Sequence, residues 1–386
     1  MPKKLQSIKG FYDVLPDKTP LWHFVEDKMR EVLNLYAYEK INLPLVEPTS
    51  LFIDSVGTHT AIVEKESLGG VCLNWGCIPT KALLKSAQVF DYIQHANDYG
   101  INITEATTNF DGMISRSRGV ADGMSKGIEF LFKKNKIDKL MGFGKLAGKK
   151  KVEVTADGGA KTIYEAEHII LATGGRAREL PNVKIDNEKI IGYRKAMVME
   201  KQPKSMVVMG SGAIGVEFAD FYNTMGTKVT VVEFMDRIVP VEDADISKEL
   251  EKQLKKKGIT VLTSSEVTKV DTSGAGVKAT VKSAAGESVL EAEILLSAVG
   301  IAPNIENIGL EENGIKVEKG RIVVDKGQQT SVAGIYAIGD CSPGQALAHV
   351  AGKEGINAAE SIGYLEKKCN HKPDAIDYNN IPGCTY

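Results

Sequence analysis

Apolar and polar residues follow one another along this chain in patterns that predict both helices and strands. Between Leu21 and Tyr36 the apolar residues recur at helical spacing, which predicts an amphipathic helix. A second amphipathic helix is predicted after residue 80, with an apolar side that runs from Leu83 to Phe90. The stretch between them that is rich in Gly and Cys, residues 67–80, shows neither period, so we expect it to be irregular.

The rest of the chain alternates between strand and helix patterns. From Ser205 the order is strand, glycine-rich turn, helix and strand, which is a βαβ unit. Further strands are predicted within 150–172, 259–299 and 321–340, and a helix over 346–363. This alternation predicts an α/β fold with parallel sheets.

Composition narrows the class of protein. A chain of 386 residues is long enough for two or three domains. Its net charge of −2 argues against a nucleic-acid or membrane-surface partner, and no apolar run reaches the ~18 residues of a membrane span. The N-terminus lacks the apolar stretch of a signal peptide, and five cysteines are too few for a disulfide scaffold. We therefore expect a cytoplasmic protein.

The strongest local signal is GGVCLNWGCIPTK, residues 69–81. Cys72 and Cys77 are five residues apart, so a regular helix would turn their side chains away from each other. A bond between them needs an irregular loop, which Trp75-Gly76 can supply, and Pro79 suits the first turn of the next helix. Cys77 then lies at a helix N-terminus with Lys81 on the same face, and both features lower the pKa of a thiol. This pattern favours redox chemistry.

Other roles for the cysteine pair remain open from spacing alone. The two could be buried structural cysteines or half of a zinc site. The remaining cysteines, Cys341, Cys369 and Cys384, are scattered and form no second pair at ligand-like spacing. That distribution favours the redox interpretation, and we expect no metal site.

The second signal is a glycine-rich loop that follows a predicted strand and opens a helix. Gly210, Gly212 and Gly215 match G-x-G-x-x-G, and Glu233 closes the next strand at the distance expected of a group that binds the adenosine ribose. Glu233 would repel a 2′-phosphate, and only Arg237 is basic nearby. The loop therefore predicts a dinucleotide site that prefers NAD over NADP.

The third signal is the strand GIYAIGD, residues 334–340, with a helix behind it. Asp340 at the end of a buried strand is well placed to bind sugar-like hydroxyls, and the helix dipole can stabilise negative charge on a reduced flavin. By itself this motif does not differ from an ordinary aspartate at a strand end.

Together these motifs resemble the pyridine nucleotide-disulfide oxidoreductase family, over about residues 67–386. They occur in that family's order: the cysteine pair, the turn Ala172-Thr173-Gly174, the glycine-rich loop and the Gly-Asp motif. Within the family, SLGGVCLNWGCIPTKALLKSA most resembles the dihydrolipoamide dehydrogenases, with glutathione and mercuric reductases as relatives. The resemblance implies FAD and NAD as cofactors, a redox-active Cys72–Cys77 disulfide and a homodimer. Its implied partner is the lipoyl group of 2-oxo acid dehydrogenase or glycine cleavage complexes.

The resemblance also assigns roles to single residues. Cys77 would be the thiol next to the flavin, and Cys72 the thiol that exchanges with dihydrolipoamide. Lys81 would contact the flavin ring and pair with Glu217, while Asp340 would hold the ribityl chain. The other cofactor positions are Gly144, Thr173, Gly174, Gly210, Gly212, Ala213, Ile214, Gly215, Glu233, Val267, Ala298, Gly300, Ala346, Leu347, Ala348 and His349. Of these, His349 is expected to be positional rather than a base.

Residues 1–66 resemble a different family, the start of histidyl-tRNA synthetase, through IKGFYDVLP, LPLVEPTSLF and GTHTAIVEKE. The two resemblances meet at IVEKE, residues 62–66, so we infer a chimera joined there. Before residue 67 the only glycines are Gly10 and Gly57, which predicts no phosphate loop for the ADP half of FAD in that stretch.

These resemblances predict two Rossmann-like domains, of which the FAD-binding one lacks its N-terminal βαβ unit. A dimerisation domain that carries a His–Glu base is expected to be truncated. The predicted segments are a synthetase-like fragment (1–66), a partial FAD-binding domain (67–180), an NAD-binding domain (181–303), a return segment of the FAD domain (304–378) and the start of the dimerisation domain (379–386).

Three hypotheses about function follow. The first is oxidation of dihydrolipoamide by NAD, with FAD and the cysteine pair as the relay; another flavin disulfide reductase, of glutathione or mercuric reductase type, is its nearest variant. The second is an inactive fragment that retains only NAD binding. The third is a synthetase-related binder of tRNA or histidine, which the missing ATP-binding motifs disfavour.

Overall fold

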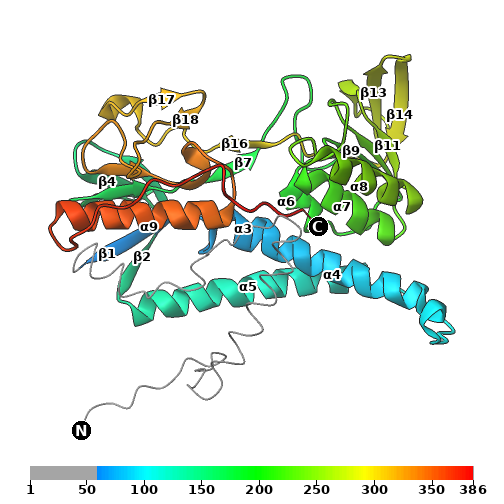
Figure 1. The fold of residues 1–386 in the computed structure, drawn as a ribbon, viewed down its shortest axis with the longest axis horizontal. Coiled ribbons are helices and arrows are strands. Elements are labelled where there is room, and N and C mark those ends of the chain that lie inside the picture. The colour runs from blue at the N-terminus through cyan, green and yellow to red at the C-terminus, as the bar shows by residue number, and fades with distance from the viewer. Residues whose placement is uncertain (1–58, 386) are drawn as a thin grey trace, which may run out of the picture. The chain divides into compact units, whose positions relative to one another are not determined.

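A computed structural model describes residues 59–385 of the chain (Figure 1). The helix predicted between Leu21 and Tyr36, and the rest of the synthetase-like stretch up to residue 58, lie outside the described residues. Among residues 59–385, no helix combines the length and the apolar composition that crossing a membrane requires.

The largest sheet of the described residues has five parallel strands in the order β11-β10-β9-β15-β8. The strands are β8 (Ile190–Ile191), β9 (Ser205–Met209), β10 (Lys228–Val232), β11 (Thr260–Leu262) and β15 (Ile294–Ser297). Their Val, Met and Leu side chains are buried on both faces, as in a parallel sheet covered by helices. Helix α7 (Ala213–Thr224) joins β9 to β10, so the predicted βαβ unit is confirmed, and α8 (Ala244–Lys256) contacts β11.

A three-stranded antiparallel sheet accounts for the strand-rich stretch after residue 259. It consists of β12 (Glu266–Asp271), β13 (Val277–Ser283) and β14 (Gly286–Ala292), and β14 contacts β9 of the parallel sheet. Alternate residues of β13 are buried, which gives this sheet one core face and one outer face.

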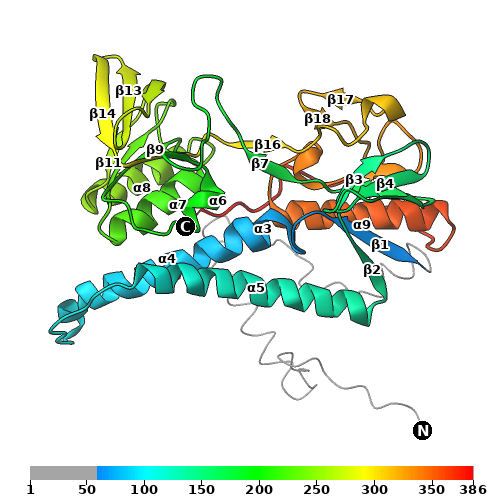
Figure 2. The same ribbon diagram turned by 180° about the vertical axis from the view of Figure 1, so that it is seen from behind.

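One short helix and two long helices surround the cysteine motif. Helix α3 (Gly70–Trp75) precedes α4 (Cys77–Gln94), and α5 (Phe110–Lys134) runs beside α4 (Figure 2). The prediction of an irregular segment over 67–80 was therefore wrong, because the chain is helical on both sides of a break at Gly76. The helical repeat of apolar residues could not be recognised there, because α3 has only six residues.

Helix α5 was not predicted from the sequence, because it contains four glycines in 25 residues. Tertiary contacts stabilise it instead. Ala121 is fully buried, and Ser117 donates a hydrogen bond from Oγ to the Pro79 carbonyl at 2.9 Å. The Asn109 side chain caps its N-terminus by accepting from Gly112 N at 2.9 Å. Helix α5 thereby supports the first turn of α4.

Two parallel strand pairs and an antiparallel sheet make up the remaining α/β part. Strand β1 pairs with β2, and β6 pairs with β19, although the strands of each pair are far apart in sequence. The elements are β1 (Thr60–Glu64), β2 (Ile137–Met141), β3 (Phe143–Leu146), β4 (Lys151–Thr155), β5 (Lys161–Glu165), β6 (Ile169–Leu171), β19 (Ile335–Ala337) and α9 (Ala348–Leu365).

Short elements complete the described residues. They are β7 (Gly175–Ala177), β16 (Ile301–Pro303), β17 (Val317–Glu318), β18 (Arg321–Ile322), α6 (Tyr193–Ala196) and the 3₁₀ turns η1 (Ala96–Tyr99), η2 (Glu311–Asn313) and η3 (Gly339–Cys341). The predicted α/β class with parallel sheets is confirmed, and the predicted helix over 346–363 lies within two residues of α9.

Candidate active site

The two cysteines lie on either side of the break between α3 and α4. Cys72 is in the middle of α3, and Cys77 is the first residue of α4, so the predicted position at a helix N-terminus is confirmed. Cys72 is partly buried and Cys77 is exposed. Pro79 occupies the first turn of α4, where its missing N–H costs nothing. Within residues 59–385, no cluster of three or more His, Cys, Asp or Glu side chains could hold a metal ion.

Asn74 holds the loop between the cysteines in place. It is only 3 % exposed, and its Nδ2 donates to the carbonyls of Leu68 at 3.0 Å and Gly70 at 3.1 Å. The backbone carbonyl of Asn74 accepts a hydrogen bond from Nη1 of Arg118, on α5, at 2.6 Å. A buried amide that satisfies these backbone groups fixes the loop because an unmade bond in a buried site is costly.

Trp75 is contacted by two guanidinium groups from different elements. Arg118 of α5 lies 4.4 Å from the ring centroid, and Arg194 of α6 lies 5.2 Å from it. Arg194 also donates to Glu66 at 2.8 Å, just before the cysteine motif. Such cation–π contacts stabilise the ring by about 0.5–1 kcal/mol each where solvent has access.

The two thiols differ in acidity. A hydrogen bond from the Cys72 thiol lowers the pKa of Cys77 to about 6, and the backbone N–H of Cys77 and the charge of Lys81 act in the same direction against partial burial. The same hydrogen bond, together with burial, raises the pKa of Cys72. At neutral pH the reduced pair therefore holds a thiolate on Cys77 and a proton on Cys72, as thiol–disulfide exchange requires.

Lys81 and Glu217 form an ion pair that joins two helices, as the family resemblance implied. Lys81 extends from α4, one turn beyond Cys77, and Glu217 from α7, two residues after the last loop glycine. The Glu217 side chain is 7 % exposed and that of Lys81 34 % exposed. This pair connects the thiol helix to the helix that opens at the glycine-rich loop.

The glycine-rich loop has the close approaches that a dinucleotide fold needs. A Cβ on Gly215 would lie 2.0 Å from the Gly210 carbonyl oxygen, and one on Gly210, whose φ is 97°, would lie 2.5 Å from the Ala298 carbonyl oxygen. Nothing lies within 4 Å of the Cβ position of Gly212, which leaves room beside the backbone. Ala213 and Ile214 open α7, with its N-terminus available to a pyrophosphate. The residues present therefore fit NAD.

Glu233 directly follows β10, and its carboxylate faces the glycine-rich loop. It is 7 % exposed and accepts three hydrogen bonds: from Ser211 N at 2.8 Å and Ser211 Oγ at 2.6 Å on Oε2, and from Met235 N at 2.8 Å on Oε1. The predicted acidic residue therefore lies at the glycine-rich loop. Most of the acceptor positions of its carboxylate are occupied by hydrogen bonds from Ser211 and Met235.

Asp340 lies in the turn η3 after β19, next to the end of β6. Burial raises the pKa of its carboxyl while Arg321 opposes that effect, and the carboxylate accepts no hydrogen bond from the described residues. A half-buried acceptor left open in this way suits the hydroxyls of a ribityl chain. The fit to the flavin end of FAD is therefore good.

A buried glutamate supports the Asp340 turn. Glu354 of α9 is 1 % exposed, accepts from Gly339 N at 2.5 Å, and accepts from the Tyr378 hydroxyl at 2.7 Å. The segment after α9 follows that helix back towards its N-terminus, because Asn357 donates to the Asp374 carbonyl and His349 contacts the Pro382 carbonyl at 2.9 Å.

The other predicted cofactor positions are scattered around these groups. Thr173 and Gly174 follow β6 and bond to Asn304, at 2.6 Å from Thr173 Oγ. Residues 346–349 form the approach to α9 and its first turn, and Leu347 caps it without a side-chain bond. Val267 is buried in the core, so only its backbone could meet NAD, and Gly300 bonds through its carbonyl to Arg178 N. Gly144 of β3 packs against Val63.

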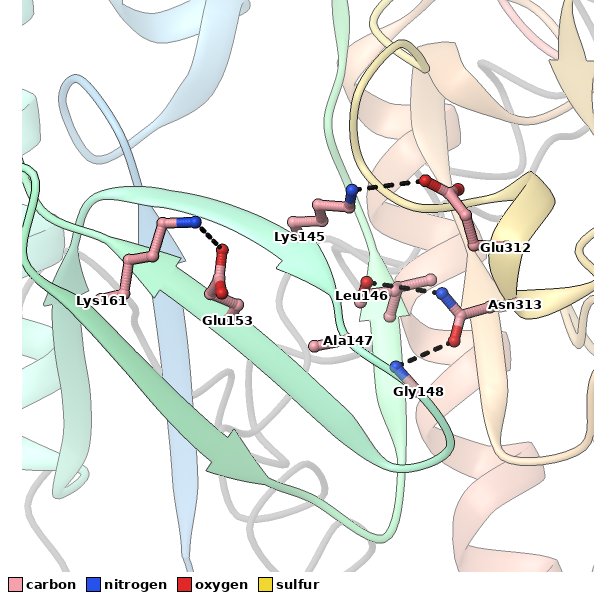
Figure 3. Close-up of a pocket in the computed structure, with 8 residues that line it drawn as sticks. All are labelled: Lys145, Leu146, Ala147, Gly148, Glu153, Lys161, Glu312 and Asn313. Carbon is pink, nitrogen blue, oxygen red and sulfur yellow. Dashed lines mark hydrogen bonds and ion pairs between the residues drawn. The ribbon is translucent and has the colours of Figure 1, made fainter.

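The pocket in Figure 3 is lined by none of the predicted site residues, although Lys145 in its lining directly follows Gly144. It has a volume of about 410 Å³ and is lined by Lys145, Leu146, Ala147, Gly148, Glu153, Lys161, Glu312 and Asn313. Its charges pair with each other, Lys145 with Glu312 at 3.3 Å and Lys161 with Glu153 at 2.9 Å. It therefore offers no uncompensated group to a ligand.

Sequence reasoning missed several supporting residues. Ser211 stood inside the quoted glycine motif but was treated as a spacer, and Glu354 could have been found as a charged residue on the apolar side of a predicted helix. Arg118 carried no signal, since its helix was not predicted.

A paired thiol and thiolate beside a dinucleotide-binding fold define an oxidoreductase that couples disulfide exchange to a nicotinamide nucleotide. The chain belongs to the pyridine nucleotide-disulphide oxidoreductase family, whose profile matches residues 49–355. The match begins ahead of residue 67, where the sequence resemblance was placed.

The chain is similar to dihydrolipoyl dehydrogenases. It is 44 % identical to that of Rhizobium etli over 350 residues, which cover 86 % of this chain and 71 % of the relative. It is 42 % identical to that of Zymomonas mobilis over 327 residues, which cover 84 % and 69 %. FAD and NAD are the cofactors of this class of enzyme.

Among solved structures, LpdA from Mycobacterium tuberculosis aligns with a TM-score of 0.75 at 27 % identity, over 82 % of this chain and 68 % of that one. The flavoprotein disulfide reductase RclA from Escherichia coli aligns with a TM-score of 0.68 at 24 % identity, over 78 % of this chain and 64 % of that one, which shows the shared fold.

Proposed function

We propose that this chain is a dihydrolipoyl dehydrogenase, which oxidises a dihydrolipoyl group and passes the electrons to NAD. The observation that carries the proposal is the cysteine pair on either side of the break between α3 and α4, where the Cys72 thiol lowers the pKa of Cys77 to about 6. The relatives named above support the choice of substrate. In the overall reaction the two thiols of the substrate lose two electrons and two protons; NAD⁺ gains both electrons and one proton, and the other proton goes to solvent.

The chain's own residues would supply the dithiol–disulfide step. One substrate thiolate attacks the sulfur of Cys72 in the Cys72–Cys77 disulfide, which releases Cys77 and leaves the substrate bonded to Cys72. The second substrate thiol then attacks the first substrate sulfur, which forms the cyclic disulfide of the product and releases Cys72. Cys77 leaves as a thiolate because its pKa is low, whereas Cys72 leaves with a proton. This supports Cys77 as the retained thiolate and Cys72 as the exchanging thiol. Exposure alone does not rank them, since Cys77 is the more exposed.

FAD, when bound, relays two electrons between the cysteine pair and NAD. Lys81 and Asp340 would hold its flavin end, and the uncapped N-terminus of α9 would stabilise negative charge there. The ADP half fits less well, because residues 59–385 contain one G-x-G-x-x-G loop between a strand and a helix, at Gly210–Gly215, and the sequence before residue 59 has only Gly10 and Gly57.

We therefore expect the purified chain to retain FAD weakly. Each lost hydrogen bond to a charged phosphate costs about 1.5–3 kcal/mol, so a missing loop weakens binding by several powers of ten. The measurement is the visible flavin spectrum before and after gel filtration. A flavin that stays bound in equal proportion to protein would contradict this expectation.

NADH is expected to bind more tightly than NADPH. The Glu233 carboxylate lies at the loop, so it would repel a 2′-phosphate, whereas a 2′-hydroxyl can donate a hydrogen bond to it. The difference should be about 1–3 kcal/mol, or roughly 5- to 150-fold in Kd. Fluorescence titration of both nucleotides measures it, and tighter NADPH binding would overturn the assignment.

The activity test is reduction of NAD⁺ by dihydrolipoamide with FAD added in excess. Oxidised glutathione with NADPH, and Hg²⁺ with NADPH, serve as the matched tests of the two related reductases. Activity with dihydrolipoamide alone would support the proposal. NADH binding without any turnover would instead favour the second candidate, a chain that retains only the nucleotide site.

The finer organisation is part of this proposal. The pairing of β6 with β19 supports a FAD-binding domain made of two chain segments, residues 67–180 and residues 304–378. The five-stranded parallel sheet supports an NAD-binding domain over residues 181–303, between these segments. The family match begins at residue 49, which supports a junction with the synthetase-like segment before the predicted residues 62–66. A homodimer and a lipoyl group of a 2-oxo acid dehydrogenase or glycine cleavage complex are the proposed partners.

A further inference from the structure

Ser211, between the first two glycines of the loop, has all three of its polar atoms bonded. Its N–H and hydroxyl both donate to Oε2 of Glu233, at 2.8 and 2.6 Å, and its carbonyl accepts from Val239 N at 3.0 Å. The residue is completely buried. The hydroxyl is the unusual element, because any residue at this position would offer the same N–H.

The segment after Glu233 is held against Ser211 in a strained conformation. Val239 has a φ of 37°, in the left-handed region that a β-branched residue rarely adopts, and it is 2 % exposed. A conformation of this kind is unfavourable by itself and persists where the surroundings enforce it. The contact to Ser211 is one such constraint.

The acceptor positions of Glu233 follow from these bonds. A carboxylate offers about four lone-pair positions, two on each oxygen. Ser211 occupies both on Oε2, and Met235 N occupies one on Oε1. One position on Oε1 is left for a ligand hydroxyl. Without the serine hydroxyl a second position opens on Oε2, and the carboxylate loses a bond that fixes its rotation.

We infer that Ser211 is a positioning residue for nucleotide selection: its hydroxyl orients the Glu233 carboxylate so that a single acceptor position faces the ribose 2′-hydroxyl of NAD. The inference rests on the proposed NAD site. Its substrate class is a dinucleotide with an unphosphorylated ribose, and Ser211 acts on it only through Glu233.

The test compares nucleotide binding by Ser211→Ala with that of the unchanged chain. The expected result is an NADH Kd that rises about tenfold and an NADPH Kd that changes less than about twofold, because only the hydroxyl-binding geometry is lost. Fluorescence titration gives both values without flavin or turnover. Ser211→Thr, which retains the hydroxyl, is expected to restore at least half of the lost preference.

The matched control is Ser247→Ala. Ser247 is also completely buried, and its hydroxyl donates at 2.5 Å to the Ile238 carbonyl in the same segment after Glu233. It should lower the thermal unfolding midpoint about as much as Ser211→Ala while leaving the NADH-to-NADPH ratio unchanged. An equal loss of preference in both variants would show a general loosening and overturn the inference.

Two other results separate the inference from the proposal beneath it. If the unchanged chain binds neither nucleotide, the NAD site itself is wrong and the role of Ser211 with it. If the unchanged chain prefers NADH and Ser211→Ala keeps that preference, the NAD site stands and only the inference fails.

Discussion

Replacement of Cys77 by serine is expected to lower dihydrolipoamide-dependent NAD⁺ reduction by at least about 10³-fold, as loss of an attacking or leaving nucleophile does in other enzymes. Serine keeps the size and the helix N-terminal position but cannot form the disulfide with Cys72. The measurement is steady-state turnover with saturating FAD. The control is Cys384→Ser, which removes another exposed thiol and should leave turnover within about twofold.

The same thiol sets a pH dependence. Because the pKa of Cys77 is about 6, the reduced protein should lose its reactive thiolate as the pH falls through that value, and keep it above. Alkylation of Cys77, followed by mass spectrometry, should therefore be half-maximal near pH 6. Cys72→Ala removes the hydrogen bond that contributes most to the low pKa, so its midpoint should move upward. A midpoint that stays at that of an ordinary thiol in the unchanged chain would refute the assigned roles.

Replacement of Lys81 by methionine is expected to destabilise the fold by about 2–4 kcal/mol. The Glu217 side chain is 7 % exposed, so its charge loses the Lys81 partner in a site that water scarcely reaches. The expected loss of stability is at the lower end of the range for a broken buried ion pair, because the Lys81 side chain is 34 % exposed. Urea unfolding, analysed at constant m-value, measures the change.

The double variant Lys81→Met, Glu217→Gln tests the cause. It removes both charges, so it should recover at least half of the stability that the single variant loses. If the double variant is as unstable as Lys81→Met, the loss comes from packing around the lysine stem and not from the broken ion pair.

The sequence predicted those parts of the fold whose pattern is local. Strand β9, the turn at Gly210 and helix α7 each agree with their own period and turn chemistry, so their bounds were found closely. The cysteine motif was located correctly, but its helical character was not, because six residues of α3 cannot display a repeat. Helix α5 was missed because its glycines oppose it, and its stabilising contacts come from α4.

The residues of the candidate site could be predicted where they belong to a sequence motif. They could not be predicted where they are distant in sequence and contact the site only in the folded chain. Cys77, Lys81 and Glu217 were expected to act together, and the structure places Lys81 against Glu217 from helices 136 residues apart in sequence. Arg194 and Glu354 had no such motif, since their importance depends on which carbonyls or rings the fold brings within reach.

The tryptophan between the two cysteines gives this molecule a natural optical reporter. The sequence contains two tryptophans, and Trp75 has guanidinium groups at 4.4 and 5.2 Å from its ring centroid. Indole emission responds to nearby charge and to water, and both are set here by how α5 and α6 meet the cysteine loop. Trp75 lies between Cys72 and Cys77 in the sequence, so we expect formation or cleavage of a bond between these cysteines to shift the backbone on both sides of its ring. The emission of Trp75 is therefore expected to follow the redox state of the loop without an added dye.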